Sequence, residues 1–369
     1  MYINSSYEKK YKKYKYMYQK LKSLSGGECT SLPNPEEEDI VTRENLLDLC
    51  PGERITIKNK CYEVRSLYKW IITGNHKILP LTQKQISYEE EQRLIQAYEL
   101  LSKTTLSKNK LIQLYPDLQY VTSLNLSYSG YIDITTNTFN NLPRLQHLYL
   151  RNNQIKELQP NTFNNLPYLE VLNLKHNKIS ILQSGIFVNL LELYILYLNK
   201  NQIIYLQPGV FNNLPNLYKL DLSFNKIREL QPDIFNNLSR LERLNLDYNQ
   251  ISVLHPDIFN NLSRLEQLDL GNNKIQQLQP GIFDNLPRLE DLYLGSNEIQ
   301  FLQFDIFNNL LKLKTLDLGF NQIKKLQQNI FYNLSGLEEL YFINNPIGIF
   351  NETQFRQYCG LFSNVKIYI

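Results

Sequence analysis

Hydrophobic and polar residues recur with a strict period of 24 residues along most of this chain. Leucine pairs of the form L-x-L recur from Leu148 and Leu150 to Leu316 and Leu318, and the series closes with Leu340 and Phe342. Because side chains alternate along a strand, each pair predicts a short strand with one buried face. A fixed period without insertion or deletion predicts identical turns stacked in one direction.

An asparagine follows three residues after each pair. We call these residues the ladder asparagines; they are Asn153, Asn177, Asn201, Asn225, Asn249, Asn273, Asn297, Asn321 and Asn345. A side-chain amide both donates and accepts hydrogen bonds, and a buried amide without partners costs about 1–3 kcal/mol. We therefore expect these amides to bond the backbone of adjacent turns in a continuous ladder.

Phenylalanine also recurs with this period, and in several units a proline precedes it by three residues, as in Pro160 and Phe163. The pattern predicts an irregular or one-turn helical outer side, with the aromatic rings stacked inside. The set comprises Phe139, Phe163, Phe187, Phe211, Phe235, Phe259, Phe283, Phe307 and Phe331.

Both ends of the array depart from the consensus, as expected for turns that shield a one-dimensional core. A partial repeat begins near Leu111, where Ser129 replaces the first ladder asparagine. Downstream, Phe355 and Tyr358 occupy core positions of the period, and residues 365–369 predict a last strand displaced by one residue.

The repeated unit, L-x-x-L-x-L-x-x-N-x-I-x-x-L-x-P-x-x-F-x-N-L-x-x, resembles the 24-residue leucine-rich repeat. The resemblance implies an α/β solenoid over residues 111–369, a horseshoe with a parallel β-sheet on its concave face. Extracellular members of this family commonly carry cysteine-rich caps, whereas this chain has only Cys359 there. The abundance of Asn, Lys, Ile and Tyr is similar to that of leucine-rich repeat proteins of giant DNA viruses.

The variable strand positions form columns on the concave face, and these columns are the candidate partner-binding surface. Positive charge predominates in the early turns and negative charge in the later ones, and tyrosines occur throughout, a residue type favoured at interfaces. The candidate residues are His147, Tyr149, Arg151, Lys175, Tyr197, Lys219, Asp221, Arg243, Asp269, Asp291, Tyr293, Asp317 and Tyr341. A solvated face without a partner, or a partner on the convex side, is the alternative.

The columns hold one histidine, no cysteine and no serine beside a general base, so they predict no catalytic residues. The chain has four cysteines and no C-x-x-C pair. We therefore expect no metal, no cofactor and no enzymatic activity.

Residues 40–110 do not follow the period and predict a small α+β domain. Leu67, Trp70 and Ile71 lie on one face of a short helix, and a second helix is predicted from Tyr88 to Leu101. This order resembles the latter half of a U-box, which implies docking of a ubiquitin-conjugating enzyme at Pro80. Residues 31–49 more faintly resemble an F-box, and an unrelated α+β cap is the remaining alternative.

Residues 1–39 form a basic tail and linker. Seven lysines and one glutamate lie in residues 1–27, while the whole chain carries a net charge of only +3. Tyrosines spaced by three and four residues would form one stripe on a helix. The segment could serve as a partner helix, a membrane-surface helix or a basic arm touching nucleic acid, or it is simply a solvated tail.

The longest apolar run has six residues, which is too short to span a bilayer, and the first 27 residues lack the apolar stretch of a secretory signal. The sequence thus predicts an intracellular, monomeric protein. Its function is predicted to be that of a non-enzymatic protein interaction scaffold; the alternative is the substrate-recognition component of a ubiquitin ligase.

Overall fold

A computed structural model describes residues 54–57, 60–63, 67, 71, 85–102, 105–115, 117–140, 142–348 and 351–369. The basic tail and Pro80 lie outside these residues. The expectations placed on them, including the contact with a ubiquitin-conjugating enzyme, stay predictions.

Among the described residues before residue 103, the structure contains two strands and a helix. Strands β1 (Arg54–Ile57) and β2 (Lys60–Glu63) pair in antiparallel fashion. Helix α3 (Tyr88–Ser102) matches the predicted helix. It begins with a reciprocal pair of bonds, since the Ser87 N–H donates to Glu90 Oε2 (2.9 Å) and the Glu90 N–H donates to Ser87 Oγ (3.2 Å). This capping arrangement satisfies amides that have no partner within the helix.

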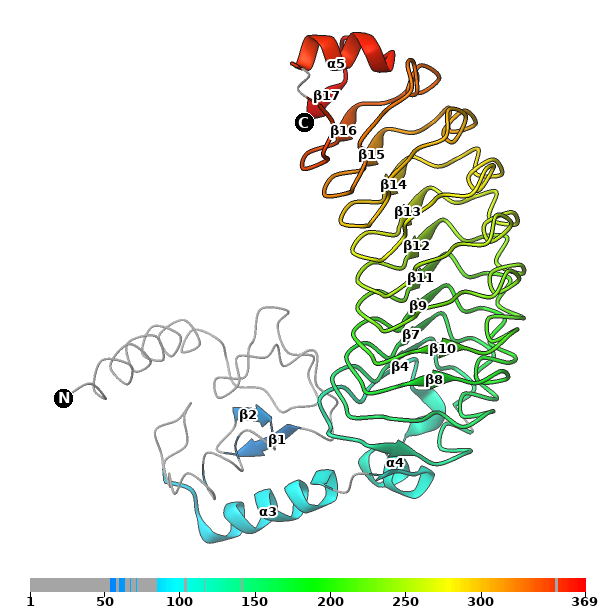
Figure 1. Cartoon of the computed structure of the whole chain (residues 1–369). Helices are drawn as coiled ribbons and strands as arrows, with labels where there is room; N and C mark the ends of the chain where they lie inside the picture. Colours follow the sequence, from blue (N-terminus) through cyan, green and yellow to red (C-terminus); the bar gives the residue numbers. More distant parts are fainter. Residues whose placement is uncertain are drawn as a thin grey trace, which may run out of the picture.

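The repeats stack into a curved array whose strands line the inner side of the curve (Figure 1). Eleven strands form one parallel sheet, in chain order from one end to the other. They are β4 (Ser123–Asn125), β6 (His147–Tyr149), β7 (Val171–Asn173), β9 (Ile195–Tyr197), β11 (Lys219–Asp221), β12 (Arg243–Asn245), β13 (Gln267–Asp269), β14 (Asp291–Tyr293), β15 (Thr315–Asp317), β16 (Glu339–Tyr341) and β17 (Lys366–Tyr368). The predicted solenoid with a parallel concave sheet is confirmed.

The outer side carries little regular structure. Short parallel pairs form between β8 (Ile181–Leu182) and β10 (Tyr205–Leu206), and between β3 (Thr105–Leu106) and β5 (Asp133–Ile134). The segments around the recurrent phenylalanines are turns. The predicted irregular outer side is therefore present.

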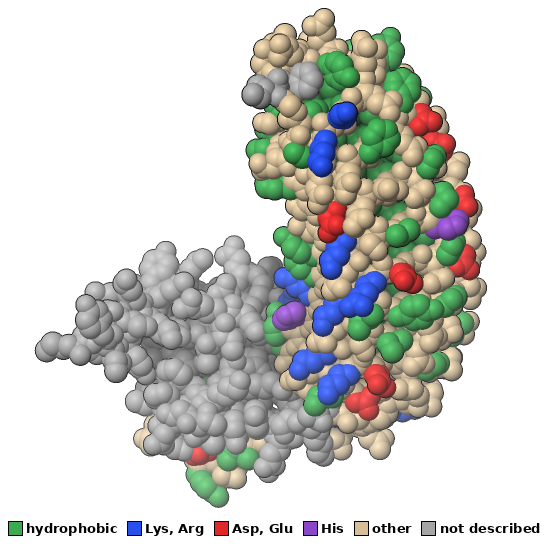
Figure 2. Space-filling model, viewed as in Figure 1, with side chains coloured by type: hydrophobic (Ala, Val, Ile, Leu, Met, Phe, Trp, Pro, Cys, Tyr) green, Lys and Arg blue, Asp and Glu red, His purple; other side chains and the backbone are tan. Residues whose placement is uncertain are grey.

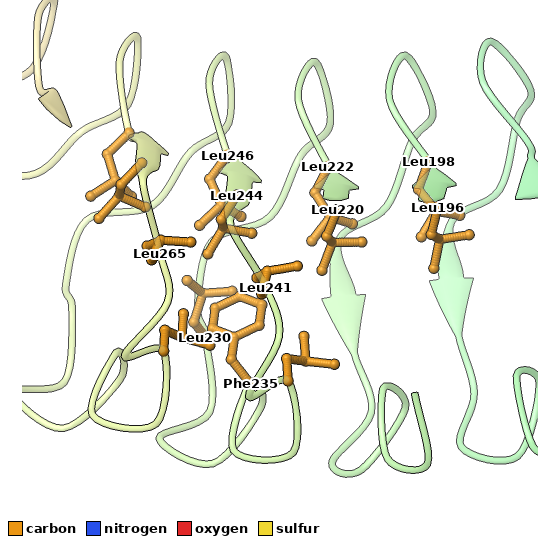
Figure 3. Packing of buried hydrophobic residues seen from close by; sticks show 14 of the residues in the cluster. Leu196, Leu198, Leu220, Leu222, Leu230, Phe235, Leu241, Leu244, Leu246 and Leu265 are labelled. Carbon is orange, nitrogen blue, oxygen red and sulfur yellow. The ribbon is translucent and has the colours of Figure 1, made fainter. Parts of the chain in front are cut away.

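The core is continuous through the array. Leu244 at the centre of its strand and Leu246 beyond it point inward beside Leu241, and the ring of Phe235 fills the space toward the outer side (Figure 3). The nine recurrent phenylalanines are each at most 1% exposed, and neighbouring rings such as Phe163 and Phe187 stack with centroids 6.4 Å apart. Each buried ring removes about 150–250 Å² of surface from water, so this spine is a large part of the hydrophobic stabilisation.

The ladder asparagines bond adjacent turns as predicted. The Asn225 amide nitrogen donates to the carbonyls of Leu222 (2.9 Å) in its own turn and Leu198 (3.1 Å) in the preceding one. Its Oδ1 accepts from the Ile203 N–H at 3.0 Å. The other ladder asparagines repeat this pattern, for example Asn273 with Leu246, Leu270 and the Ile251 N–H. One side chain thus bonds three buried backbone groups, which explains why the asparagine recurs in every turn from Asn153 to Asn345.

The amino-terminal end of the array is closed by α4 (Lys108–Leu114) and a 3₁₀ turn, η4 (Leu118–Tyr120). Leu111 is buried against the first turn. Ser129, in the first ladder position, donates to the Ser127 carbonyl at 3.3 Å. The partial repeat expected there is present.

The carboxy-terminal end differs from the prediction in two respects. Helix α5 (Glu352–Cys359) replaces the outer turn, so the phase of the period is lost. On this helix Phe355 and Cys359, four residues apart, are buried, while the predicted core residue Tyr358 is 38% exposed. Strand β17 pairs Ile367 with Leu340, an interval three residues longer than the period, so the predicted displacement of one residue was wrong.

Candidate recognition surface

Each repeat strand has three residues, of which the middle one is a buried leucine or, in β17, Ile367. The first and third residues therefore point to the concave side, because side chains alternate along a strand. We call these positions the first and second strand columns, and we call the position two residues further on the loop column. Neighbouring strands are in register, so each column runs straight along the array.

The structure places all thirteen candidate residues in these columns. His147, Lys219, Arg243 and Asp291 lie in the first strand column; Tyr149, Tyr197, Asp221, Asp269, Tyr293, Asp317 and Tyr341 lie in the second; and Arg151 and Lys175 lie in the loop column. All are half-buried except Arg243, which is exposed. The surface is therefore contiguous, as predicted, whereas its use in binding stays a prediction.

Cations and aromatic rings alternate in the amino-terminal half of this face. The Lys219 ammonium lies 5.2 Å from the ring centroid of Tyr197, and the Arg243 guanidinium lies 5.8 Å from that of Tyr218. At the rim, the Lys200 ammonium lies 5.4 Å from the ring of Phe224. On the face shown in Figure 2, Lys and Arg side chains gather over this half of the array.

Two of these rings were not among the predicted residues. Tyr218 precedes strand β11 and stacks on Tyr194 with centroids 4.7 Å apart. Phe224 stacks on Tyr248 at 4.4 Å, and both are more than 40% exposed. The columns chosen from the sequence did not include either position. The signal for both was an aromatic residue at the same place in adjacent units, as in Tyr194 and Tyr218 or Phe224 and Tyr248.

The rim residues have left-handed backbone conformations. Phe224, Tyr248 and Phe320 have φ angles of 53°, 50° and 53°. This conformation costs a residue with a side chain about 1–2 kcal/mol relative to glycine. The ladder architecture imposes it at the same place in successive turns, from Tyr128 to Asn344.

The carboxy-terminal half of the face is acidic and has a floor of glycine. The pKa of Asp269 is raised to about 6, chiefly by burial. The Gly271 N–H, which donates to it at 3.0 Å, lowers this pKa, and the negative charges of Asp247, Asp317 and Asp221 raise it. Burial also raises the pKa of Asp317 and of Asp247. A Cβ on Gly295 would lie 2.6 Å from Asp317 Oδ2, so glycine there makes room for this carboxylate.

Tyr341 closes the acidic half. Its hydroxyl donates to Glu339 Oε2 at 2.8 Å, and its ring stacks on Tyr368 of the last strand at 4.4 Å. The hydrogen bond to Glu339 is the main reason that the pKa of Tyr341 is raised to about 12, and burial adds to it. The side chain therefore stays a neutral donor at physiological pH.

Where the two halves meet, the face contains a hollow of about 160 Å³ between β11, β12 and β13. Its polar lining comprises Lys219, Arg243 and Gln267 from the first strand column and Asp221, Asn245 and Asp269 from the second. Cations therefore lie along one side of the hollow and carboxylates along the other, and the two columns are about 7 Å apart along the backbone, given the rise of two strand residues.

The described residues contain no group of three or more His, Cys, Asp and Glu side chains that could hold a metal ion. In the same part of the chain, no helix is both long and apolar enough to cross a bilayer. Cys359 is free and buried, and burial raises the pKa of its thiol to about 12. This cysteine therefore contributes to packing and is protected from ionisation.

The sequence matches the leucine rich repeat family over residues 119–179, 143–203, 191–251, 239–299, 288–347 and 311–362. These overlapping matches cover well over half of the chain. Together with the stacked turns and the asparagine ladder, they define the class: the chain belongs to the leucine rich repeat family. No curated protein matches the chain significantly.

Solved structures with TM-scores above 0.5 show the same fold. The TLR13–ssRNA13 complex is similar with a TM-score of 0.51 and 23% identity, over 70% of this chain and 44% of that one. InlJ of Listeria monocytogenes has a TM-score of 0.52 and 20% identity, over 73% of this chain and 53% of that one. A leucine-rich repeat protein of Leptospira interrogans is 25% identical with a TM-score of 0.48, over 72% and 75% of the two chains. The chain thus spans about half the length of the TLR13 and InlJ chains that it resembles.

Proposed function

We propose that this protein is a non-enzymatic scaffold that binds another protein on the concave face of its repeats. The observation that carries the proposal is that different residues of each strand face the core and the concave surface. The leucine is buried and serves the core, while its two neighbours stay half-exposed in straight columns of tyrosine and charge. Variation in these columns leaves the core unchanged, so recognition and folding are served by different residues.

The composition of the face supports a protein partner. Tyrosines such as Tyr149, Tyr197 and Tyr293 offer apolar area together with a polar tip, and such residues are enriched at protein interfaces. Eleven adjacent strands, spaced by about 4.8 Å, give a surface on the order of 50 Å long. A face of this length accommodates an interface of ordinary size.

The proposal is tested by reversing charge within the loop column. We expect Arg151→Glu with Lys175→Glu to weaken capture of partners from native cell extract, measured by quantitative mass spectrometry, because both side chains face the concave side. Their thermal unfolding should stay within a few degrees of the parent, since neither contributes to the core.

A matched control reverses two exposed arginines outside the columns, Arg264→Glu with Arg288→Glu. This pair changes net charge by the same amount and should leave capture unchanged. Equal loss of capture in both double variants, or collapse of folding in the first, would contradict the assignment of the concave face.

A further inference from the structure

The hollow at β11, β12 and β13 contains two cations placed side by side. Lys219 and Arg243 are paired in register on adjacent parallel strands. Like charges in such positions destabilise a sheet by a few tenths of a kcal/mol up to about 1 kcal/mol. Within residues 117–140 and 142–348, neither side chain forms an ion pair. The repulsion between the two charges opposes folding, whereas an anion placed between them would relieve it.

Both cations are held in place by rings. Each lies over an aromatic ring of the preceding turn, Lys219 over Tyr197 and Arg243 over Tyr218. A cation over an aromatic face keeps its charge and loses part of its side-chain freedom. Less entropy is then lost when a ligand binds, so the two groups are preorganised for one anionic partner group.

The carboxylates on the other side of the hollow restrict the class of ligand that can supply the anion. Asp221 and Asp269 line it, and Asp291, Asp317 and Glu339 continue the negative charge along the later strands. A chain with a charge on every unit, such as a nucleic acid, would meet these carboxylates and be repelled. A peptide can place a single carboxylate at the cations and neutral or basic residues beyond it.

We propose that this hollow binds an acidic side chain from an extended segment of the protein partner, with Lys219 and Arg243 bonding its carboxylate. Tyr197 and Tyr218 flank the segment, and the acidic strands beyond β13 fix its direction by excluding further acidic residues. The inference rests on the proposed function and names the partner's chemistry at one place on the concave face.

The test uses three fluorescein-labelled probes and the full chain. The first is a twelve-residue peptide with a single Asp-Glu pair among Gly, Ser and Tyr; the second has Asn-Gln in place of that pair; the third is a twelve-nucleotide oligothymidylate. Binding is measured by fluorescence anisotropy at low and at physiological salt. We expect the acidic peptide to bind at least about 10-fold more tightly than the amide peptide, because carboxylates form stronger hydrogen bonds to cations.

A double variant, Lys219→Gln with Arg243→Gln, should remove this preference. The matched control, Arg264→Gln with Arg288→Gln, should retain it, and circular dichroism of both variants checks that the array is folded. Three results would overturn the inference: equal binding of the two peptides, an acidic preference that survives in the first variant, or tighter binding of the oligonucleotide that the first variant abolishes.

Failure of this inference can be distinguished from failure of the proposed function. If the peptides do not discriminate, but charge reversal at Arg151 and Lys175 still lowers capture of native partners, the concave face binds protein and only the acidic-segment inference is wrong. If capture is also unaffected, the proposed function itself is wrong.

Discussion

At the scale of single residues, the concave face contains an aspartate, Asp269, whose burial disfavours its charged form. Asp269 has its pKa raised from 3.8 to about 6, chiefly by burial. The folded protein therefore keeps a proton at pH values where the unfolded chain has released it. By linkage, stability falls as the pH rises through the window between about 4 and 6 and stays lower above it.

Asp269→Asn removes this cost without removing the oxygen that accepts from Gly271. We expect the variant to be more stable than the parent at pH 7.5, by an amount on the order of 2–3 kcal/mol at most. At pH 4 the two proteins should be alike, because Asp269 is then protonated. Urea unfolding at both pH values measures the difference. The exposed Asp305→Asn is the control, and a gain of the same size there would contradict the account.

The strained rim offers a second test at this scale. Phe320 has φ of 53° and is 58% exposed, so its side chain contributes little to the core. Replacing it with glycine relieves the left-handed conformation. We expect Phe320→Gly to change the free energy of unfolding by no more than about 1 kcal/mol, in the stabilising direction. A loss of several kcal/mol in urea unfolding would contradict this account, because it would mean that the exposed ring makes stabilising contacts that the structure does not show.

At the scale of the element, each turn is held by its ladder asparagine and its phenylalanine. Asn225→Ala leaves the buried Ile203 N–H without a partner. It also removes one of the two amide hydrogen bonds at each of the Leu198 and Leu222 carbonyls, which keep their bonds from Asn201 and Asn249. We expect it to lower the free energy of unfolding by about 3 kcal/mol or more, measured by urea titration.

The control for this prediction is Asn237→Ala. Asn237 is exposed and donates only to Asn212 Oδ1 on the outer side, at 2.8 Å. It should cost less than about 0.5 kcal/mol. Similar losses at Asn225 and Asn237 would mean that the ladder bonds do not stabilise the turns.

Much of this element was predictable from sequence because its physics is local and repeated. The residue types at the positions of Leu244, Asn225 and Phe235 recur every 24 residues. A single fixed interval means that every turn has the same geometry and stacks on its neighbour in the same way. Tyr358 was assigned to the core wrongly because α5 replaces the periodic turn, and the phase of a helix cannot be read from a 24-residue period. The cation–ring pairs of the candidate surface also escaped prediction, since they depend on side-chain directions between neighbouring turns.

At the scale of the whole molecule, the array is quasi-one-dimensional, so each turn interacts chiefly with its neighbours. Removal of one full period, residues 241–264, rejoins the chain in register. We expect this deletion to fold, with a urea m value smaller by roughly a tenth. Removal of residues 241–252 alone breaks the ladder and should give an unstable or aggregated protein. If both deletions fold equally well, the ladder does not set the register.

The central claim is that the concave columns, and not the outer turns, contact the partner. Tyrosines on both sides report on this directly: Tyr149, Tyr197 and Tyr293 lie in the second strand column, whereas Tyr168 and Tyr332 are exposed outside the columns. Hydroxyl-radical footprinting of the chain with and without its captured partner measures their protection. The account predicts that oxidation falls at the three column tyrosines and is unchanged at the other two; protection confined to Tyr168 and Tyr332 would contradict it.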